Sequence, residues 1–381
     1  MTTSMDSANF YKDLQEVLEK DFPITFKEIE NGRLNVDWTY LISPEVVEIP
    51  TAVRDEMKNA IQSLFHFSRN LSTPPSHHIQ NDSVLMSYDF HTHSDGRAKL
   101  IEVNTNASGF LISCFAEAAH QSKSYFDLEA IQSLKSSFLL EHSKGSQSSE
   151  TLQIAIVDDQ IESQKMKFEF YLYKELFEHW GWKSEICEAS DLKLENKKVM
   201  TPGGLAVNFI YNRTTDFFLT ETSHQVLQSA WKEGFAVVSP QPVEYERLAD
   251  KNRLIEFQNT SNLPKPIEQV LLKTYDIAHF TDPDELWAER KNYFFKPKNS
   301  FGGKSAYRGQ SLSRKVFQRM LEDDALVQEY FPPEKLKDWK FDIRCYAYKD
   351  QLQHIAARLY QGQLTNFSTP FGGFGPVRLK S

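Results

Sequence analysis

The stretch Ser87–Asn106, SYDFHTHSDGRAKLIEVNTN, decides how the fold of this chain is interpreted. Two extended runs flank the pair Asp95-Gly96, and Asp-Gly between such runs is a strong signal for a β-hairpin. Because side chains alternate along a strand, Glu102 and Asn104 share one face, and the short turn brings Asp89 opposite them. Two carboxylates and an amide oxygen are hard ligands that suit Mg²⁺. The hairpin therefore predicts a magnesium site, with acids that simply face solvent as the alternative.

The composition argues against several classes of protein. With 381 residues, 40% of them hydrophobic, the chain can build two or three packed units. A net charge of −9 argues against a general nucleic-acid binder, which needs a basic face. No apolar run approaches the roughly 20 residues of a membrane span, and the start lacks a secretory signal. The three cysteines have no CxxC spacing. We therefore expect a cytoplasmic protein without nucleic-acid or membrane partners.

Hydrophobic spacing indicates how the chain is organised around this hairpin. Apolar residues at helical spacing, such as Val53, Met57 and Ile61, mark a helical N-terminal segment. Between Ile154 and Val238, short apolar runs alternate with helices, which is typical of an open, mostly parallel sheet. No GxGxxG pattern supports a dinucleotide site there.

A second group of residues suits phosphate. Lys296-Pro297-Lys298 ends an apolar run, and Gly302-Gly303 follows shortly after. Glycines let backbone N–H groups approach phosphate oxygens, and lysines neutralise their charge, although the pattern is not a Walker A loop. Further along, the segment Gln328–Phe331 ends another apolar run and can offer backbone groups to a flat base. An ordinary loop with solvated lysines is the alternative.

Two arginines form a third group. Arg344 and Arg358 lie on two successive strand-like runs, ahead of Asn366 and the Gly372-Gly373 turn. The guanidinium fork suits a carboxylate or a phosphate. Surface ion pairs with the abundant acids are the alternative explanation.

Taken in order, these pieces resemble the ATP-grasp ligases. Most members carry the Asp and Glu-x-Asn hairpin last, whereas here it precedes Lys296. This is the circularly permuted order of the eukaryotic-type glutathione synthetases and of the glutathionylspermidine and trypanothione synthetases. Three further segments are similar to parts of the glutathione synthetases: IEVNTNASGF (Ile101–Phe110), NFIYNRTTDFF (Asn208–Phe218) and SPQPVEYERLADKN (Ser239–Asn252).

The resemblance implies an α+β chain with a two-lobed, circularly permuted ATP-grasp fold and an inserted open α/β substrate domain. Its expected parts are an N-terminal helical segment (1–80), the metal-binding hairpin region (81–145), the α/β substrate-type domain (146–245), the nucleotide-binding lobe (246–335) and the remainder of the C-terminal lobe with a glycine-rich loop (336–381).

The resemblance also implies an ADP-forming carboxylate–amine ligase that uses ATP and Mg²⁺ and forms an acyl phosphate. A small-molecule carboxylate and an amine would be its substrates. Because glutathione synthetases of this type are often dimers, the resemblance also leaves a homodimer as a possible state. For the nucleotide, the resemblance implies that the phosphates contact Lys251, Lys296, Lys298, Gly302 and Gly303, and that adenine contacts Gln328, Glu329, Tyr330 and Phe331. It implies that Mg²⁺ is bound by Asp89, Glu102 and Asn104. It also implies catalysis by Lys296, Arg344 and Arg358, and substrate binding by Arg213, Asn366, Gly372 and Gly373.

Two positions depart from the family pattern. Ser87 stands where related permuted enzymes usually have an arginine, and approximately Ser300 stands where glutathione synthetases carry a metal-binding glutamate. These departures favour the alternative of a non-catalytic nucleotide-binding scaffold, because fold does not establish activity.

A competing enzyme hypothesis starts from the same hairpin. The segment Asp89–Gly96, DFHTHSDG, resembles the opening DxHxH motif of PHP-type metal-dependent phosphoesterases, with His91 and His93 on one strand face. The remaining histidines stand in contexts that do not match the other metal ligands of that family. The hypothesis therefore rests on one short motif.

Overall fold

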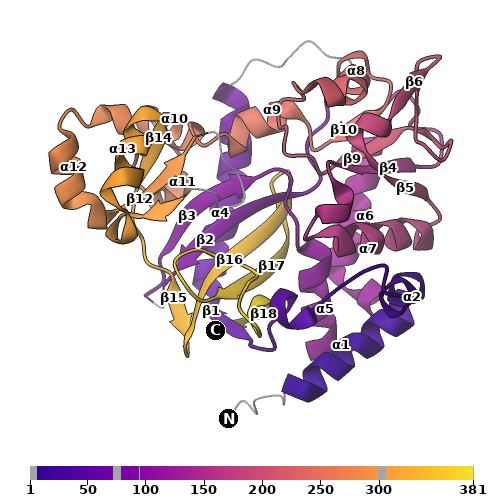
Figure 1. The fold of residues 1–381 in the computed structure, drawn as a ribbon, viewed down its shortest axis with the longest axis horizontal. Helices are drawn as coiled ribbons and strands as arrows, with labels where there is room; N and C mark the ends of the chain where they lie inside the picture. Colours follow the sequence, from indigo (N-terminus) through magenta and orange to yellow (C-terminus); the bar gives the residue numbers. More distant parts are fainter. Residues whose placement is uncertain (1–6, 72–78, 94, 299–305, 381) are drawn as a thin grey trace.

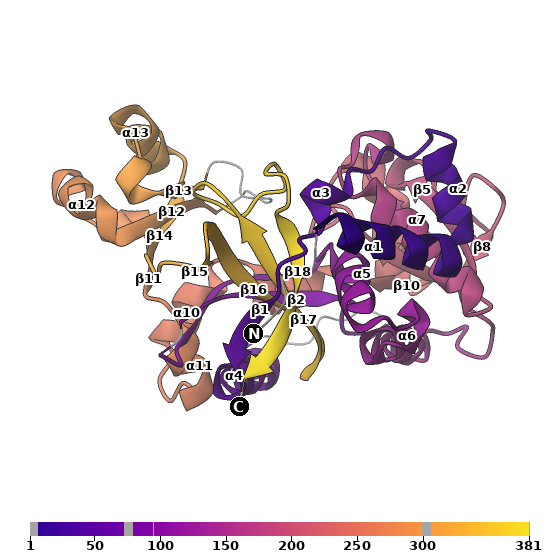
Figure 2. The same cartoon turned by 90° about the horizontal axis from the view of Figure 1, so that it is seen from below.

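The computed structural model describes residues 7–71, 79–93, 95–298 and 306–380. The expected two-lobed mixed fold is confirmed: a central sheet lies between a smaller lobe and a helix-rich α/β part (Figure 1; Figure 2). Among the helices of the described segments, none is long and apolar enough to cross a membrane.

The central sheet joins strands from both ends of the chain. Its order is β1-β18-β17-β16-β2-β3, with β15 on the side of β16, and β1 and β18 run parallel while the other neighbours are antiparallel. The hairpin of the first third therefore lies directly beside strands of the last third. The strands are β1 (Val47–Pro50), β2 (Met86–Thr92), β3 (Ala98–Asn104), β15 (Glu334–Leu336), β16 (Trp339–Tyr348), β17 (Gln351–Tyr360) and β18 (Gly373–Lys380).

Helices cover both faces of this sheet. On one face, α4 buries Met57, Ile61 and Leu64 at helical spacing, in one core with Tyr88 and Ile343 of the sheet. The opposite core joins α1, α5 and α6 to β16 and β18 and continues into the α/β part. The helices are α1 (Ser7–Asp21), α2 (Pro23–Glu30), α3 (Trp38–Leu41), α4 (Thr51–Leu71), α5 (Phe110–Gln121), α6 (Glu129–His142), α9 (Pro242–Glu244), α10 (Arg253–Asn259) and α11 (Lys265–Val270).

The α/β part contains a parallel sheet with the order β10-β9-β4-β5. The strand order reverses between β4 and β9, and ligands of open α/β sheets bind outside the carboxyl ends of strands at such a switch point. The elements are β4 (Gln153–Asp158), α7 (Lys167–His179), β5 (Lys183–Glu188), β9 (Phe209–Asn212), α8 (Gln225–Glu233) and β10 (Val237–Ser239), with a small antiparallel sheet of β6 (Lys193–Glu195), β7 (Lys198–Met200) and β8 (Ala206–Val207).

The smaller lobe has its own antiparallel sheet, in the order β11-β14-β12-β13. Its apolar core, which includes Phe295, Phe317 and Val327, is separate from the cores of the central sheet. Its position against the central sheet therefore depends on contacts made at its edge. The elements are β11 (Thr274–Asp276), α12 (Pro283–Glu289), β12 (Tyr293–Pro297), β13 (Tyr307–Arg308), α13 (Arg314–Glu322) and β14 (Ala325–Glu329).

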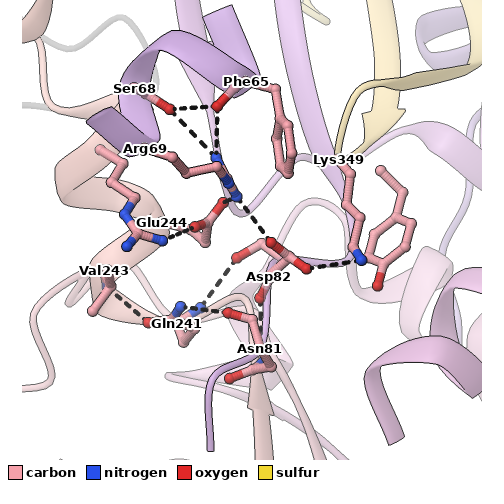
Figure 3. A network of polar contacts seen from close by, with 12 residues as sticks. Phe65, Ser68, Arg69, Asn81, Asp82, Gln241, Val243, Glu244 and Lys349 are labelled. Atoms are coloured by element: carbon pink, nitrogen blue, oxygen red, sulfur yellow. Dashed lines mark hydrogen bonds and ion pairs between the residues drawn. The ribbon is translucent and has the colours of Figure 1, made fainter. Parts of the chain in front are cut away.

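A polar network ties the end of α4 to the segment that follows β10 (Figure 3). Arg69 reaches the carboxylates of Asp82 and Glu244, at 2.9 and 2.7 Å, and the side chain of Glu244 is fully buried. Lys349 pairs with Asp82 from the opposite side at 3.3 Å. Because a buried carboxylate is costly without a cation, this network anchors the start of the segment that carries Lys251.

Removing the charge of Arg69 should destabilise the protein markedly. We expect Arg69→Met to lower the free energy of unfolding by about 2 kcal/mol, because buried Glu244 loses one of its two guanidinium partners among the described residues and keeps only Arg247 at 3.1 Å. Urea unfolding measures the change. Arg33→Met is the control, since the Arg33–Glu28 pair is solvent-exposed and should contribute under about 1 kcal/mol. Equal losses in the two variants would contradict the role of the network.

Candidate nucleotide and metal site

A β-bulge shapes the end of the hairpin that carries Asp89 and Glu102. Asp89 pairs with Glu102 and Phe90 pairs with Leu100, so Ile101 is an extra residue in β3. A bulge removes a residue from the regular ladder and changes the direction of neighbouring side chains. The carbonyl of Ile101 accepts a hydrogen bond from Lys296 Nζ at 2.9 Å. The bulge therefore joins the hairpin to the smaller lobe directly beside Glu102.

Four charged side chains fill the sheet next to the hairpin, and we call them the aspartate–arginine cluster: Asp89, Asp342, Arg344 and Arg358. Arg344 donates to both oxygens of Asp89, with Nε–Oδ1 and Nη2–Oδ2 distances of 2.7 Å. Arg358 Nη2 donates to Asp89 Oδ2 at 2.8 Å, and its Nε donates to Asp342 at 2.7 Å. Two acids and two bases give the cluster no net formal charge.

Burial alone would raise the pKa of Asp89, but Arg344 and Arg358 outweigh burial and hold that pKa well below its usual range. In the same way, Asp89 raises the pKa of Arg344 in spite of burial. Asp89, Arg344 and Arg358 are therefore charged at neutral pH. Asp89, one expected metal ligand, is thus paired with both expected catalytic arginines, and Asp342 balances the remaining positive charge.

Glu102 and Asn104 are the other two expected metal ligands, and they lie beside the cluster. Asn104 Nδ2 is 3.3 Å from Asp89 Oδ2 and 3.4 Å from Glu102 Oε1. Because the two ends of an amide are assigned from such contacts, a half-turn would present Asn104 Oδ1 to a cation instead. One carboxylate with one amide oxygen fits Mg²⁺, which commonly takes its remaining ligands from water and phosphate. Asp89 fits less well as a direct ligand, because both of its oxygens accept guanidinium groups.

Two lysines, Lys296 of the smaller lobe and Lys251 of the segment after α9, interact with Glu102. Lys296 donates to Gln328 Oε1 at 2.9 Å as well as to Ile101, and burial lowers its pKa to about 8, although Glu102 opposes the shift. Lys251 donates to the carbonyl of Pro297 at 3.0 Å, and burial lowers its pKa as well. A desolvated ammonium gains much from an incoming anion, so both lysines suit phosphate.

Lys298 has different partners from the other two lysines. It forms ion pairs with Asp276 and Asp324 inside the smaller lobe, and these carboxylates raise its pKa in spite of burial. Its expected phosphate contact stays a prediction. Gly302 and Gly303, like Ser300, lie outside the described residues.

The expected adenine segment ends β14 at the edge of the smaller lobe. Gln328 lies on β14, which pairs with β11 on one side and with β12 on the other. Its side chain contacts both Lys296 and Thr274. The backbone N–H groups of Glu329 and Tyr330 donate to Lys273 and Asn292 of neighbouring segments. These hydrogen bonds fix the segment in an extended conformation beside Lys296, and the adenine assignment stays a prediction.

The phosphoesterase hypothesis finds no support in the described residues. His91 Nδ1 lies 2.7 Å from the carbonyl oxygen of Phe331, and Asp89 belongs to the aspartate–arginine cluster. No group of three or more His, Cys, Asp or Glu side chains in the described ranges is arranged to hold a metal ion. Asp89 and His91 of the DxHxH segment therefore contact other parts of the protein.

Arg213 lies at the carboxyl end of β9, next to the end of the hairpin. It donates to the Asn106 carbonyl at 3.1 Å and to the Tyr211 hydroxyl at 3.4 Å. Its Nε is buried and has no hydrogen-bond partner among the described residues. The nearby acids Glu169 and Asp158 help to raise the pKa of Arg213 in spite of burial. Substrate binding by Arg213 stays a prediction.

The other expected substrate residues have conformational roles. Asn366 forms its own turn, with Nδ2 donating to the carbonyls of Gln361 and Leu364 at 2.9 and 2.8 Å. Gly373 has φ +96°, and a Cβ there would overlap the Leu41 carbonyl. A Cβ at Gly372 would crowd the carbonyl of Leu359. Substrate binding by Asn366, Gly372 and Gly373 stays a prediction.

Sequence reasoning missed two residues that belong to this region. Asp342 completes the charge balance around Arg358, but its partner lies on the next strand and no local pattern marks it. Asp158 ends β4 beside Arg213, and burial raises its pKa to about 7. The position of an acid at the carboxyl end of a parallel strand was the available signal for Asp158.

Neutralising Asp89 should destabilise the fold as well as change the site. Asp89→Asn leaves Arg344 buried without its carboxylate, so we expect a loss of about 3 to 5 kcal/mol in the free energy of unfolding. Because the folded pKa of Asp89 lies below its unfolded value, its contribution is present above pH 4 or so and is lost on further acidification. Urea unfolding at several pH values measures both effects. Asp95→Asn, at an exposed turn, is the control, and an equal loss there would contradict this account.

Comparisons with known proteins identify the fold. A glutathione synthetase-like effector from Globodera pallida matches with a TM-score of 0.52 and 12% identity, covering 98% of this chain and 99% of that chain. A putative gamma-glutamylcysteine synthetase from Methylobacillus flagellatus KT matches with a TM-score of 0.50 and 11% identity, covering 88% and 87%. No protein-family model matches the sequence, and no curated protein matches it. The likeness is therefore one of fold, and it confirms the expected resemblance to glutathione synthetase-like structures.

Proposed function

We propose that this protein is an ATP-dependent ligase that joins a carboxylate to an amine and releases ADP and phosphate. The observation that carries the proposal is the position of two buried lysines near Glu102: Lys296 donates to the carbonyl of Ile101, next to Glu102, at 2.9 Å, and Lys251 donates to the carbonyl of Pro297, next to Lys296, at 3.0 Å. An anionic, metal-chelating polyphosphate satisfies both sides of this arrangement. The circularly permuted relation to other ATP-grasp ligases belongs to the same proposal.

In this proposal Lys251 and Lys296 hold phosphate oxygens, and Gln328–Phe331 lie beside the base. Glu102 and Asn104 would hold Mg²⁺, which supplies positive charge for the transferring phosphoryl group when bound. In this proposal Asp89 holds Arg344 in place and is not a direct ligand of the metal, because both of its oxygens already accept hydrogen bonds from the Arg344 guanidinium.

The chemistry would have two steps. A carboxylate oxygen of the substrate attacks the γ-phosphorus, ADP leaves, and an acyl phosphate forms. An amine then attacks the acyl carbon and loses a proton, while phosphate leaves. Lys296 stabilises charge on the transferring group, Arg344 and Arg358 steady it from the cluster, and Arg213 holds a carboxylate of the substrate.

A non-catalytic nucleotide-binding scaffold is the second candidate, because the aspartate–arginine cluster is neutral and Ser87 is buried where relatives carry a charge. An ADP-release assay with a panel of carboxylates and amines separates the two. Release that requires both substrates supports the ligase. Nucleotide binding without release under any combination supports the scaffold.

Glu102 should be essential for turnover. We expect Glu102→Gln to reduce ADP release by about a hundredfold or more, because the metal loses its carboxylate, while thermal unfolding stays unchanged. Glu195→Gln is the matched control on an exposed strand of the α/β part. Full activity of Glu102→Gln would contradict the site assignment.

Nucleotide affinity should fall as the pH rises through about 8. The ammonium form of Lys296 binds phosphate, and its lowered pKa means that this form is lost near pH 8 in the ligand-free protein. Calorimetric titration of a non-hydrolysable ATP analogue from pH 6.5 to 9.5 measures the effect. Lys296→Arg, which stays charged, should flatten the profile. A wild-type profile that is already flat would contradict the role of Lys296.

A further inference from the structure

The His-x-His pair of the hairpin has no role in the ligase chemistry proposed above, yet both rings contact one residue. His91 Nδ1 lies 2.7 Å from the carbonyl oxygen of Phe331, and the ring of His93 lies edge-to-face on the Phe331 ring, with centroids 5.3 Å apart. The guanidinium of Arg97, across the turn, lies 5.5 Å from the centre of the same ring. Three residues of one hairpin therefore converge on the residue that follows β14.

This contact matters because the smaller lobe has a separate apolar core. Phe331 leaves that lobe at the end of the segment expected to face adenine, and His91 belongs to the strand that carries Asp89. A second hydrogen bond, from Lys296 to Ile101, joins the same two elements at the bulge. The His91 contact thus joins the two elements at the end of the candidate site where adenine is expected. The Lys296 contact joins them at the end where the phosphates are expected.

The donor of this hydrogen bond is the His91 ring. Since a carbonyl only accepts, His91 must carry a proton on Nδ1. The contact with Phe331 therefore requires this position of the proton.

We propose that His91 is a positioning residue that fixes the end of β14 on the hairpin, so that the base-facing segment and the metal-facing strand keep one relative placement. The hydrogen bond is local to the protein and does not need a nucleotide. Its consequence for nucleotide affinity rests on the proposed function, whereas its consequence for the ordering of the segment after β14 does not.

Hydrogen exchange of the ligand-free protein tests the proposal. His91→Leu removes the donor, and we expect peptides covering residues 329–333 to exchange about three- to tenfold faster. His91→Asn, whose amide can reach the position of Nδ1, should restore protection to within twofold. His66→Leu, at an exposed histidine of α4, is the matched control and should not change this segment. Unchanged exchange in His91→Leu, or no rescue by His91→Asn, overturns the proposal.

A second measurement on the wild-type protein covers the case in which His91→Leu does not fold. Nitrogen-15 NMR of labelled histidine should show the His91 proton on Nδ1. A proton on Nε2 instead overturns the proposal.

The affinity for a non-hydrolysable ATP analogue gives the functional readout. We expect it to weaken three- to tenfold in His91→Leu and to recover in His91→Asn, whereas equal affinities in all three proteins would overturn the link to the base-facing segment. If the wild-type protein binds no nucleotide, the proposed function fails, and the exchange experiment still decides the role of His91.

Discussion

A carboxylate or a guanidinium that leaves water loses several kcal/mol of hydration, and the central sheet buries two of each in the aspartate–arginine cluster. Arg344 lies directly across from Asp89, and Arg358 directly across from Asp342. A slip of one residue in either pairing would turn a charged side chain to the opposite, apolar face. Charge balance therefore fixes the register of β2, β16 and β17, and β3 follows through its pairing with β2.

The position of Glu102 depends on this register. The hairpin is held by its neighbour β16, the bulge at Ile101 follows from the pairing of β2 with β3, and the bulge presents a carbonyl to Lys296. The lysine comes from a lobe with its own core, so the site forms where two independently packed units meet. Ligand sites occur preferentially at such boundaries between packed units.

Local features of the site were predictable from the sequence, and long-range ones were not. The Asp-Gly turn and the shared face of Glu102 and Asn104 follow from strand alternation and turn chemistry. The ion pairs of Asp89 join residues separated by 255 and 269 positions, and no periodicity reveals such partners. Motif matching suggested metal ligation for His91, whereas the folded chain gives that ring a backbone carbonyl. The resemblance to glutathione synthetases supplied Lys251 and Arg213, which no local pattern marks.

In the proposed function, a nucleoside triphosphate binds together with Mg²⁺ between Glu102 and the two lysines Lys251 and Lys296. Calorimetric titration of a non-hydrolysable ATP analogue, with and without Mg²⁺, tests it most directly. The account predicts saturable binding that is at least tenfold tighter with Mg²⁺ than without it. No binding, or binding that is equally tight without the metal, would contradict it.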